Sequence, residues 1–306
     1  MGAGVAEDTV SAAESASRKR IALSAHLTTP ALLGLPIGWL AVFFVAPIAI
    51  VAAYSVDVLT LFPGSHGFTL SAWHAFLHSS VYLRLFWSSV KLSLTVSAVV
   101  VALAYPLAYY LALSGTKRKY VLLLLLIAPF LTSYLLRVLA WKVLLGDEGP
   151  INTFLSWVGL HPLSLIYTRF AVVLVLGYIW LPFVALPIFV SLESLDRRLL
   201  EAASDLGASR LQAFRRVTLP LSLPGVFAAF LFVFIPTLGE FVTPSLVGGA
   251  SASSGYMYGN QIQDLFVRGF PDWETGSVLA IFLLAVVTLL TVAFARFLQP
   301  RQVATD

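Results

Sequence analysis

Few residues in the apolar parts of this chain have side chains that could do chemistry. Glu240 is the acid that lies well within an apolar segment, in the run Phe234–Pro244. A carboxylate left unpaired in hydrocarbon costs several kcal/mol, so Glu240 is expected to face the interior of a helix bundle. There it could bind a cation or gate a pathway, or it could form a structural ion pair with Arg137. Both alternatives remain open. Tyr134 and Trp180 are further candidates for lining the pathway, because aromatic faces bind organic cations; the alternative is that they lie at a membrane interface, where Trp and Tyr also gather.

Side-chain patterns typical of enzymes and nucleotide-binding proteins are missing from the sequence. The phosphate-binding pattern Gly-x-x-x-x-Gly-Lys-Ser/Thr does not occur, so ATP and its Mg²⁺ would have to be bound by another chain. There is no cysteine, which excludes a thiolate metal site and a cysteine nucleophile. The five histidines lie in predicted tails and loops: His26, His66, His74, His78 and His161. We therefore expect no catalytic residue, no metal site and no cofactor in this chain.

Composition places the chain in a membrane. Of its 306 residues, 59% are hydrophobic and 11% are charged, which is too little polar surface for a soluble globular protein. Six apolar segments are each near the ~20 residues that a helix needs to cross a bilayer. They are residues 31–56, 92–112, 121–145, 170–192, 221–246 and 277–298. The sequence therefore predicts an all-α, polytopic membrane protein of six transmembrane helices, kinked at internal prolines such as Pro129 and Pro236.

The positions of Lys and Arg predict how these helices are oriented. With the N-terminus inside, thirteen of the nineteen cations fall on inside segments: Arg18, Lys19, Arg20, Lys117, Arg118, Lys119, Arg197, Arg198, Arg210, Arg215, Arg216, Arg296 and Arg301. Because cytoplasmic loops carry the excess of Lys and Arg, both termini and residues 196–220 are expected in the cytoplasm. Residues 1–30 and 299–306 would be cytoplasmic tails, and residues 31–298 the membrane domain. The net charge of +4 follows this topology and does not indicate nucleic acid.

The polar stretch 196–220 has the pattern of two short helices. Leu199, Leu200, Ala203 and Leu206 recur at helical spacing, which predicts an amphipathic helix. Gly207 could end this helix in the left-handed conformation, and Ser209 could cap a second one. The alternative is an ordinary amphipathic loop that lies on the membrane surface.

The spacing in this stretch resembles the coupling loop of ATP-binding cassette (ABC) importer permeases. The pattern is Glu201-Ala202-Ala203, three residues, Gly207, nine residues and then Val217-x-Leu219-Pro220, where Val replaces the family's Ile. The resemblance implies a type I, MetI-like bundle with a cytoplasmic coupling helix. Its partners would be a dimer of ATP-binding subunits, a second and paralogous permease subunit, an extracytoplasmic solute-binding protein and membrane lipid. Glu201 would meet a polar or basic group of the ATPase, Ala202 and Ala203 would allow close docking, and Gly207 would fix the angle between the two helices.

Residues from about 105 to 273 resemble the spermidine/putrescine-type permeases more specifically. The matching runs are PLAYY at 106–110, IAPF at 127–130, NTFL at 152–155, LEAASDLG at 200–207, LGEFV at 238–242, GN at 259–260 and DW at 272–273. The resemblance implies uptake of polyamines, or of a related small organic cation, across a bacterial inner membrane. A Gly-Glu-aromatic run also occurs in permeases similar to those for sulfate and molybdate, so Glu240 does not by itself specify a cation. The alternative cargo is an oxyanion, ferric iron, an opine or an amino-acid-like compound.

A stand-alone channel or intramembrane enzyme is disfavoured by the absent catalytic pairs and by the coupling loop.

Overall fold

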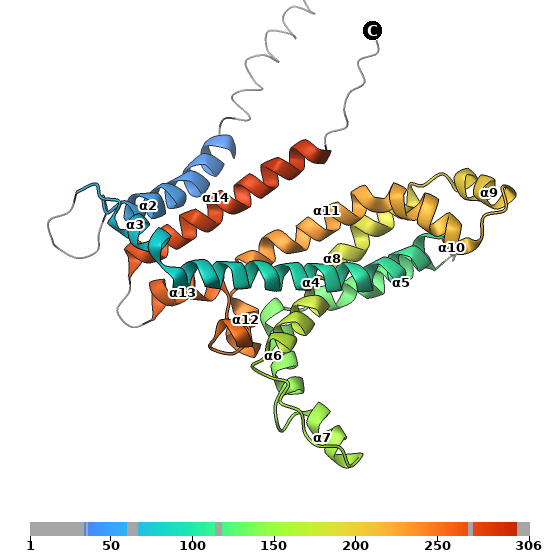
Figure 1. Cartoon of the computed structure of the whole chain (residues 1–306), viewed down its shortest axis with the longest axis horizontal. Coiled ribbons are helices and arrows are strands. Elements are labelled where there is room, and N and C mark those ends of the chain that lie inside the picture. The colour runs from blue at the N-terminus through green and yellow to red at the C-terminus, as the bar shows by residue number, and fades with distance from the viewer. Residues whose placement is uncertain (1–33, 35, 60–66, 114–117, 269–271, 299–306) are drawn as a thin grey trace, which may run out of the picture.

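The chain is helical throughout the part that the structure describes. The computed structural model describes residues 34, 36–59, 67–113, 118–268 and 272–298, and no strand occurs among them (Figure 1). The predicted tails, 1–30 and 299–306, lie outside these residues. The elements are η1 Ala41–Val45, α2 Ala46–Ser55, α3 Ser71–His78, α4 Ser80–Leu113, α5 Lys119–Ile127, η2 Ala128–Leu131, α6 Tyr134–Leu145, α7 Pro150–Trp157, α8 Arg169–Glu193, α9 Arg197–Asp205, α10 Arg210–Ala213, η3 Phe214–Thr218, α11 Leu219–Leu238, α12 Val242–Val247, η4 Ala252–Ser254, α13 Tyr258–Val267 and α14 Trp273–Leu298. The prediction of an all-α protein is confirmed.

Five of the described helical stretches are long and apolar enough to cross a membrane. They are Pro36–Ser55, Ser80–Leu113, Arg169–Glu193, Arg210–Leu238 and Trp273–Arg296. A sixth crossing results if Lys119–Leu131 and Tyr134–Trp157 form one broken span. The six apolar segments predicted from the sequence correspond to these five helices and the broken pair.

The third predicted segment, 121–145, is not one helix, and this corrects the sequence-based boundary. Its two halves, α5–η2 and α6–α7, are bent by 87° relative to each other. Pro129 lies in the tight turn η2, and the Thr132 hydroxyl donates to the Pro129 carbonyl at 2.6 Å. Thr132 and Ser133 then take extended backbone conformations, with ψ of 156° and 135°. The chain therefore leaves the helix completely at this point instead of kinking at the proline.

The second predicted segment, 92–112, starts too late. Helix α4 begins at Ser80 and runs for 34 residues, because polar side chains in its first turns lower the hydropathy without breaking the helix. Arg84 folds back along α4, and its Nε donates to the Ser80 carbonyl at 2.9 Å. Arg169, at the start of α8, donates to the Ser88 carbonyl at 3.2 Å. These two guanidinium groups are thus satisfied at one end of the bundle.

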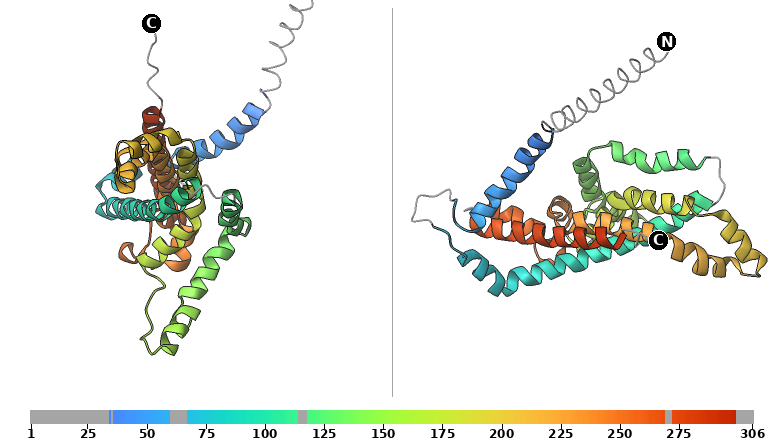
Figure 2. Two further views of the ribbon diagram at one scale, coloured as in Figure 1. Left: turned by 90° about the vertical axis from the view of Figure 1, so that its right-hand side faces the viewer. Right: turned by 90° about the horizontal axis from the view of Figure 1, so that it is seen from above.

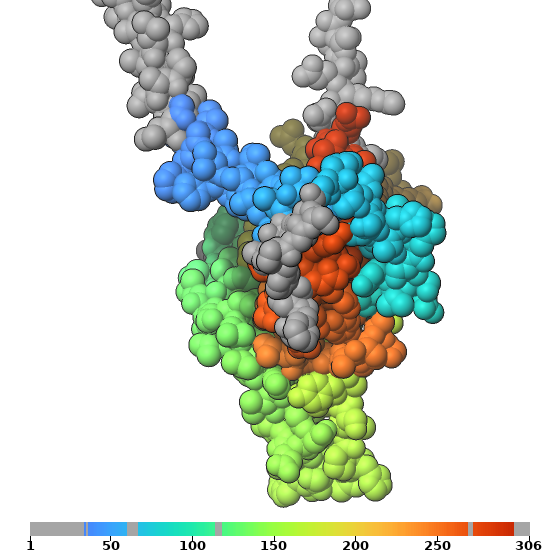
Figure 3. All heavy atoms as spheres, turned by 90° about the vertical axis from the view of Figure 1, so that its left-hand side faces the viewer, coloured from blue at the N-terminus to red at the C-terminus, as the bar shows by residue number. Residues whose placement is uncertain are grey.

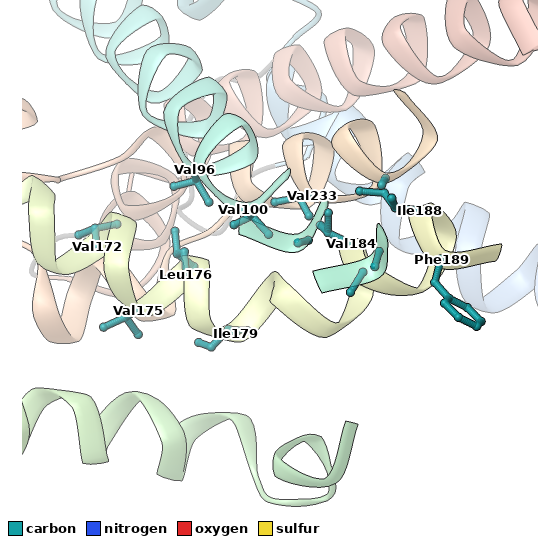
Figure 4. Packing of buried hydrophobic residues seen from close by; sticks show 14 of the residues in the cluster. Val96, Val100, Val172, Val175, Leu176, Ile179, Val184, Ile188, Phe189 and Val233 are labelled. Carbon is teal, nitrogen blue, oxygen red and sulfur yellow. The ribbon is translucent and has the colours of Figure 1, made fainter. Parts of the chain in front are cut away.

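The centre of the fold is a packed group of α4, α8 and α11 (Figure 1). Val96 and Val100 of α4 are fully buried and face Val172 and Leu176 of α8, with Val233 of α11 nearby (Figure 4). Lipid is as apolar as these side chains, so helix association in a membrane depends on close van der Waals packing instead of burial from water. The valines and the small residues of this group let the three helices approach closely.

A second, largely aromatic cluster joins α3, α13 and α14 to the start of α4. Its buried members include Phe76, Phe86 and Tyr258, and the rings of Phe86 and Phe282 meet edge to face at 5.1 Å. Helix α2 lies along α14, so the first and last spans are neighbours (Figures 1 and 2). The α6–α7 arm projects from the rest of the molecule, as the space-filling view also shows (Figure 3). The fold is thus a three-helix core with a peripheral pair on one side and a projecting arm on the other.

Gly225 allows α11 to approach α8 at a point where no side chain fits. A Cβ placed on Gly225 would lie 2.3 Å from the Ser191 Cβ, whereas one on Gly177 would lie 3.8 Å from Val100 Cγ2. We therefore expect Gly225→Ala to destabilise the protein by about 1–3 kcal/mol, the usual effect of overpacking. Thermal unfolding of the purified protein in detergent measures this effect. The matched control Gly177→Ala should unfold near the wild-type temperature, and equal midpoints for the two variants would contradict the prediction.

Candidate functional site

The stretch 196–220 forms two short helices joined by a glycine turn. Helix α9 begins after Asp196, whose carboxylate accepts from the Arg198 N–H at 3.0 Å. Gly207 has a φ of +80°, and the N–H groups of Gly207 and Ala208 donate to the carbonyls of Ser204 and Ala203 at 2.9 and 3.0 Å. This pair of bonds is a Schellman cap, which glycine favours because it has no Cβ to clash in the left-handed region. The predicted helix and glycine stop are confirmed.

The second helix of this stretch is capped as the sequence predicts. The Ser209 Oγ accepts from the Gln212 N–H at 3.3 Å, and the Gln212 Oε1 accepts from the Ser209 N–H at 2.8 Å. This capping box fixes the start of α10. The chain then passes through the π-helical turn η3 into α11, where Leu219 and Pro220 are the first two residues. The second helix is therefore continuous with a membrane span.

Aromatic contacts hold the stretch rigidly against α4, and sequence reasoning missed them. Phe214 meets Tyr105 and Tyr109 edge to face, with ring centroids 5.9 and 5.6 Å apart. The hydroxyl of Tyr105 lies 2.9 Å from the Ser222 Oγ of α11. At the base of the stretch, Lys119 of α5 forms a salt bridge with Glu193 of α8. The only sequence signal was an aromatic residue among arginines, which does not reveal a partner more than one hundred residues away.

The outer surface of this hairpin is free for contact. Figures 1 and 2 show α9 and α10 extending beyond the ends of α4 and α8. Glu201 and Ala202 are exposed, Ala203 is half-buried, and the Leu206 side chain is 88% exposed. In the described part of the chain, no hydrogen bond or ion pair engages the Glu201 carboxylate. An exposed acid, two small residues and a projecting leucine thus share one stiff protrusion.

Glu240 lies where α11 ends and the short helix α12 begins. Its Oε1 accepts from the N–H groups of Val242 and Thr243 at 2.9 and 3.2 Å and from the Tyr134 hydroxyl at 3.0 Å. The Tyr134 hydroxyl also lies 2.6 Å from the Thr243 Oγ1. Since Tyr134 has one proton to donate, the Thr243 hydroxyl donates to Tyr134 when Tyr134 donates to Glu240. Free N–H groups at a helix start favour a negative charge, so this arrangement stabilises the carboxylate.

The ion pair between Arg137 and Glu240, one of the two alternatives that the sequence left open, is not formed in the structure. Among the described residues, neither salt bridge involves either side chain. The Arg137 guanidinium instead lies over the Phe130 ring, 4.1 Å from its centroid, and the residue is 8% exposed. The reason is that α12 supplies two backbone donors and Tyr134 supplies a third, so Glu240 needs no arginine. The buried Nε of Arg137 has no hydrogen-bond partner in the described part of the chain.

The structure brings Tyr134 to Glu240 but leaves Trp180 apart from them. The Trp180 ring meets Phe183 and Phe232 at centroid distances of 5.7 and 6.3 Å. Within the described residues, no hydrogen bond or ring contact joins Trp180 to Tyr134 or Glu240. The group around Glu240 therefore consists of Glu240, Tyr134 and Thr243, of which only Thr243 was not named from the sequence.

A comparison with protein-family models identifies the class of the chain. Residues 104–303 match the model of the binding-protein-dependent transport system inner membrane component. This chain belongs to that family. The permease is accordingly a multi-pass inner-membrane protein and a transport component, not an enzyme. The match begins within α4 and includes the hairpin of α9 and α10 and the group around Glu240.

The permease is similar to several curated proteins along most of its length. It is 36% identical over 265 residues to the spermidine/putrescine transport system permease protein PotB of Escherichia coli K12, covering 85% of this chain and 94% of PotB. It is also 36% identical over 222 residues to PotB of Haemophilus influenzae, covering 72% and 76% of the two chains. The molybdenum transport system permease protein ModB of H. influenzae is 36% identical over 164 residues, which cover 50% of this chain and 68% of ModB.

Solved structures share the fold of the permease. A chain of a bacterial ABC transporter involved in the import of the acidic polysaccharide alginate matches with a TM-score of 0.64 and 18% identity, covering 89% of this chain and 95% of that one. A chain of the MetNI methionine ABC transporter matches with a TM-score of 0.51 and 19% identity, covering 71% and 94%. The expected MetI-like permease bundle is thereby confirmed.

Proposed function

We propose that the permease is the pore-forming subunit of an ATP-driven importer of spermidine, putrescine or a related small organic cation. The observation that carries this proposal is the 36% identity to E. coli PotB over 85% of this chain and 94% of PotB. The carboxylate of Glu240, which lies at a break between two helices inside the bundle, supports it. A positively charged solute that passes this break would meet a fixed negative charge, with Tyr134 beside it.

The hairpin of α9 and α10 is the proposed contact with a dimer of ATP-binding subunits, which would hold ATP and Mg²⁺. Its support is the match to the Glu-Ala-Ala-x₃-Gly spacing and the free, exposed carboxylate of Glu201. Ala202 and Ala203 would let the ATPase approach the helix closely. The excess of cations on these segments supports a cytoplasmic hairpin and cytoplasmic termini. Trp180 remains a proposed lining residue of the pathway.

Other partners complete the proposed assembly. A second, paralogous permease chain would close the pore, and lipid would cover the remaining apolar faces, such as that of η1, where all five residues are exposed. An extracytoplasmic binding protein would deliver the solute. The alginate transporter that shares this fold has been solved in complex with an alginate pentasaccharide-bound periplasmic protein, which supports this partner.

The stiffness of the hairpin is what would let ATP hydrolysis move the spans. An ATPase shifts the balance of inward-facing and outward-facing states only through its different affinity for the two states. A flexible loop would let the ATPase move without moving the spans. The hairpin is stiffened by the Schellman cap and the capping box, and it leads directly into α11. It is also fixed to α4 by the packing of Phe214 on Tyr105 and Tyr109. Closure of the ATPase dimer would therefore reorient these helices.

Transport by the reconstituted complex tests the proposal. The permease is purified with the ATP-binding subunit, second permease and binding protein of its own transport system and placed in proteoliposomes. We expect ATP-dependent accumulation of labelled spermidine or putrescine, and none with a non-hydrolysable ATP analogue. The absence of any organic-cation uptake, with ATPase activity intact, would reject the polyamine assignment.

An oxyanion is the second candidate cargo, favoured by the similarity to ModB over half of the chain. The buried and unpartnered Nε of Arg137 is a donor that an anion could use. The same proteoliposomes, loaded with the corresponding binding protein, distinguish the two candidates. Accumulation of molybdate in place of spermidine would select the oxyanion.

A further inference from the structure

A cavity lined by both polar and apolar residues lies at the opposite end of α11 from the hairpin of α9 and α10. It has a volume of about 370 Å³, which is in the range of small-molecule sites. Helices α12 and α13 and the segment between them supply most of its lining residues, and Tyr167 comes from the segment before α8. The lining residues that carry charge, hydrogen-bonding groups or an aromatic ring are Tyr167, Ser245, Tyr256, Asn260, Asp264 and Arg268.

Asp264 places a negative charge on the wall of this cavity. Its side chain is 19% exposed, and its Oδ2 accepts from the Tyr256 hydroxyl at 2.7 Å. Burial and this hydrogen bond raise the pKa of Tyr256, so the phenol stays a neutral donor. The Oδ1 accepts from the Nε of Arg268 at 2.9 Å, but the Arg268 side chain is 72% exposed. Because the Arg268 guanidinium is largely in solvent, water screens its attraction to Asp264, and another cation can compete with it for the carboxylate.

Tyr167 supplies an aromatic ring to the same cavity from an unusual backbone conformation. Its φ is +59°, in the left-handed region that bulky residues rarely adopt. The Tyr167 N–H donates to the Val247 carbonyl at 2.9 Å, which ties this conformation to the end of α12. Strain of this kind persists where the surroundings hold it and is concentrated at binding sites. Half of the Tyr167 surface is exposed, so its ring remains available to a cation.

The wall of the cavity is joined directly to the segment that holds Glu240. The Asn260 side-chain amide donates to the Phe241 carbonyl at 2.9 Å and to the Ser245 Oγ at 2.6 Å. Gly259 packs so closely on Gly239 and Glu240 that a Cβ there would lie 2.6–2.7 Å from their carbonyl oxygens. The start of α12 binds the Glu240 carboxylate, and Pro244 and Ser245 of the same helix line the cavity. The carboxylates of Glu240 and Asp264 thus belong to one structural unit.

We propose that Asp264, Tyr256 and Tyr167 form a receiving subsite for an ammonium group of the solute, which is occupied before the solute reaches Glu240. The ammonium displaces the Arg268 guanidinium from Asp264 and takes its place beside the carboxylate. This inference rests on the proposed uptake of an organic cation. It differs from a binding-protein contact, because a cavity of this size admits a small molecule and the Asp264 carboxylate, only 19% exposed, lies within its wall.

The test uses the reconstituted complex with its binding protein and compares three variants. Asp264→Asn removes the charge and keeps the shape. Asp147→Asn removes an exposed acid that does not line the cavity and serves as the matched control. Arg268→Gln removes the competing guanidinium. Two quantities are measured: spermidine imported per ATP hydrolysed, and the concentration of loaded binding protein that gives half-maximal stimulation of ATP hydrolysis.

We expect Asp264→Asn to lower spermidine import per ATP by roughly tenfold or more, the size of a lost charge-assisted contact. The half-maximal concentration of binding protein should not change. Asp147→Asn should behave as wild type, and Arg268→Gln should import at least as well as wild type. Equal losses in Asp264→Asn and Arg268→Gln would show a merely structural salt bridge, and a raised half-maximal concentration would show a binding-protein contact; either result overturns the subsite. Wild-type protein that imports no organic cation would instead reject the proposed function, so the two failures are distinguishable.

Discussion

Gly207→Pro is expected to abolish solute uptake while the protein still inserts and the complex still hydrolyses ATP. The φ of Gly207 is +80°, and the proline ring holds φ at about −65°. Proline also removes the N–H that donates to the Ser204 carbonyl. The angle between α9 and α10 would then change, and closure of the ATPase would no longer be transmitted to α11. Uptake and ATP hydrolysis measured on the same proteoliposomes would reveal the uncoupling.

Two further variants, Gly159→Pro and Gly207→Asn, show whether the loss of uptake comes from the changed turn at Gly207 or from any proline placed in a glycine turn. Gly159 has a φ of +82° and, like Gly207, has open space around its missing Cβ, so Gly159→Pro changes an equivalent turn after α7. We expect that control to keep ATP hydrolysis coupled to uptake. Asn tolerates the left-handed region better than other residues, so Gly207→Asn should retain much of the activity. Glu201→Lys should uncouple as Gly207→Pro does, and normal uptake by either of these two variants would refute the proposed role of the hairpin.

Glu240→Gln is expected to reduce cation uptake by about tenfold or more without unfolding the protein. The glutamine carbonyl can still accept from the N–H groups of Val242 and Thr243 and from the Tyr134 hydroxyl, so the start of α12 is kept. What is lost is the negative charge that a passing cation would meet. Initial rates of spermidine uptake, compared with thermal unfolding of the same preparation, measure the two effects separately.

The double variant Arg137→Glu with Glu240→Arg distinguishes a pathway role from a simple ion pair. Because the two side chains form no salt bridge in the structure, exchanging them should not restore uptake. Tyr134→Phe is the milder control, since it removes one donor and leaves the two backbone donors. Recovery of uptake in the double variant would mean that Glu240 serves only to balance Arg137.

The spans and the coupling hairpin could be predicted from the sequence because their signals are local. About 20 apolar residues in a row predict a crossing, and Ser209 and Gly207 predict a cap and a stop within one turn of their own positions. The break after Pro129 was predicted only as a kink. The bend is 87°, and beyond it α6 packs against α12, a helix from a distant part of the sequence that no residue near Pro129 predicts.

The contacts around Glu240 could not be predicted, because they join distant segments. Tyr134 and Glu240 are separated by 106 positions, and the residue type of Glu240 suggested an arginine partner. Charge left both that pairing and a pathway role open. Backbone N–H groups at the start of α12 took the role instead, since the chain breaks at Gly239 and exposes them next to the carboxylate.

The break in the third span also has a mechanical consequence. Thr132 and Ser133 form a non-helical joint between η2 and α6, and Tyr134 is the first residue after this joint. The arm beyond the joint is long, because α6 alone, with its 12 residues, extends about 18 Å. A small displacement of the Tyr134 hydroxyl, when a solute replaces it at Glu240, would therefore swing the far end of this arm through a larger distance. The position of α7 would thus depend on whether a solute occupies the site at the Glu240 carboxylate.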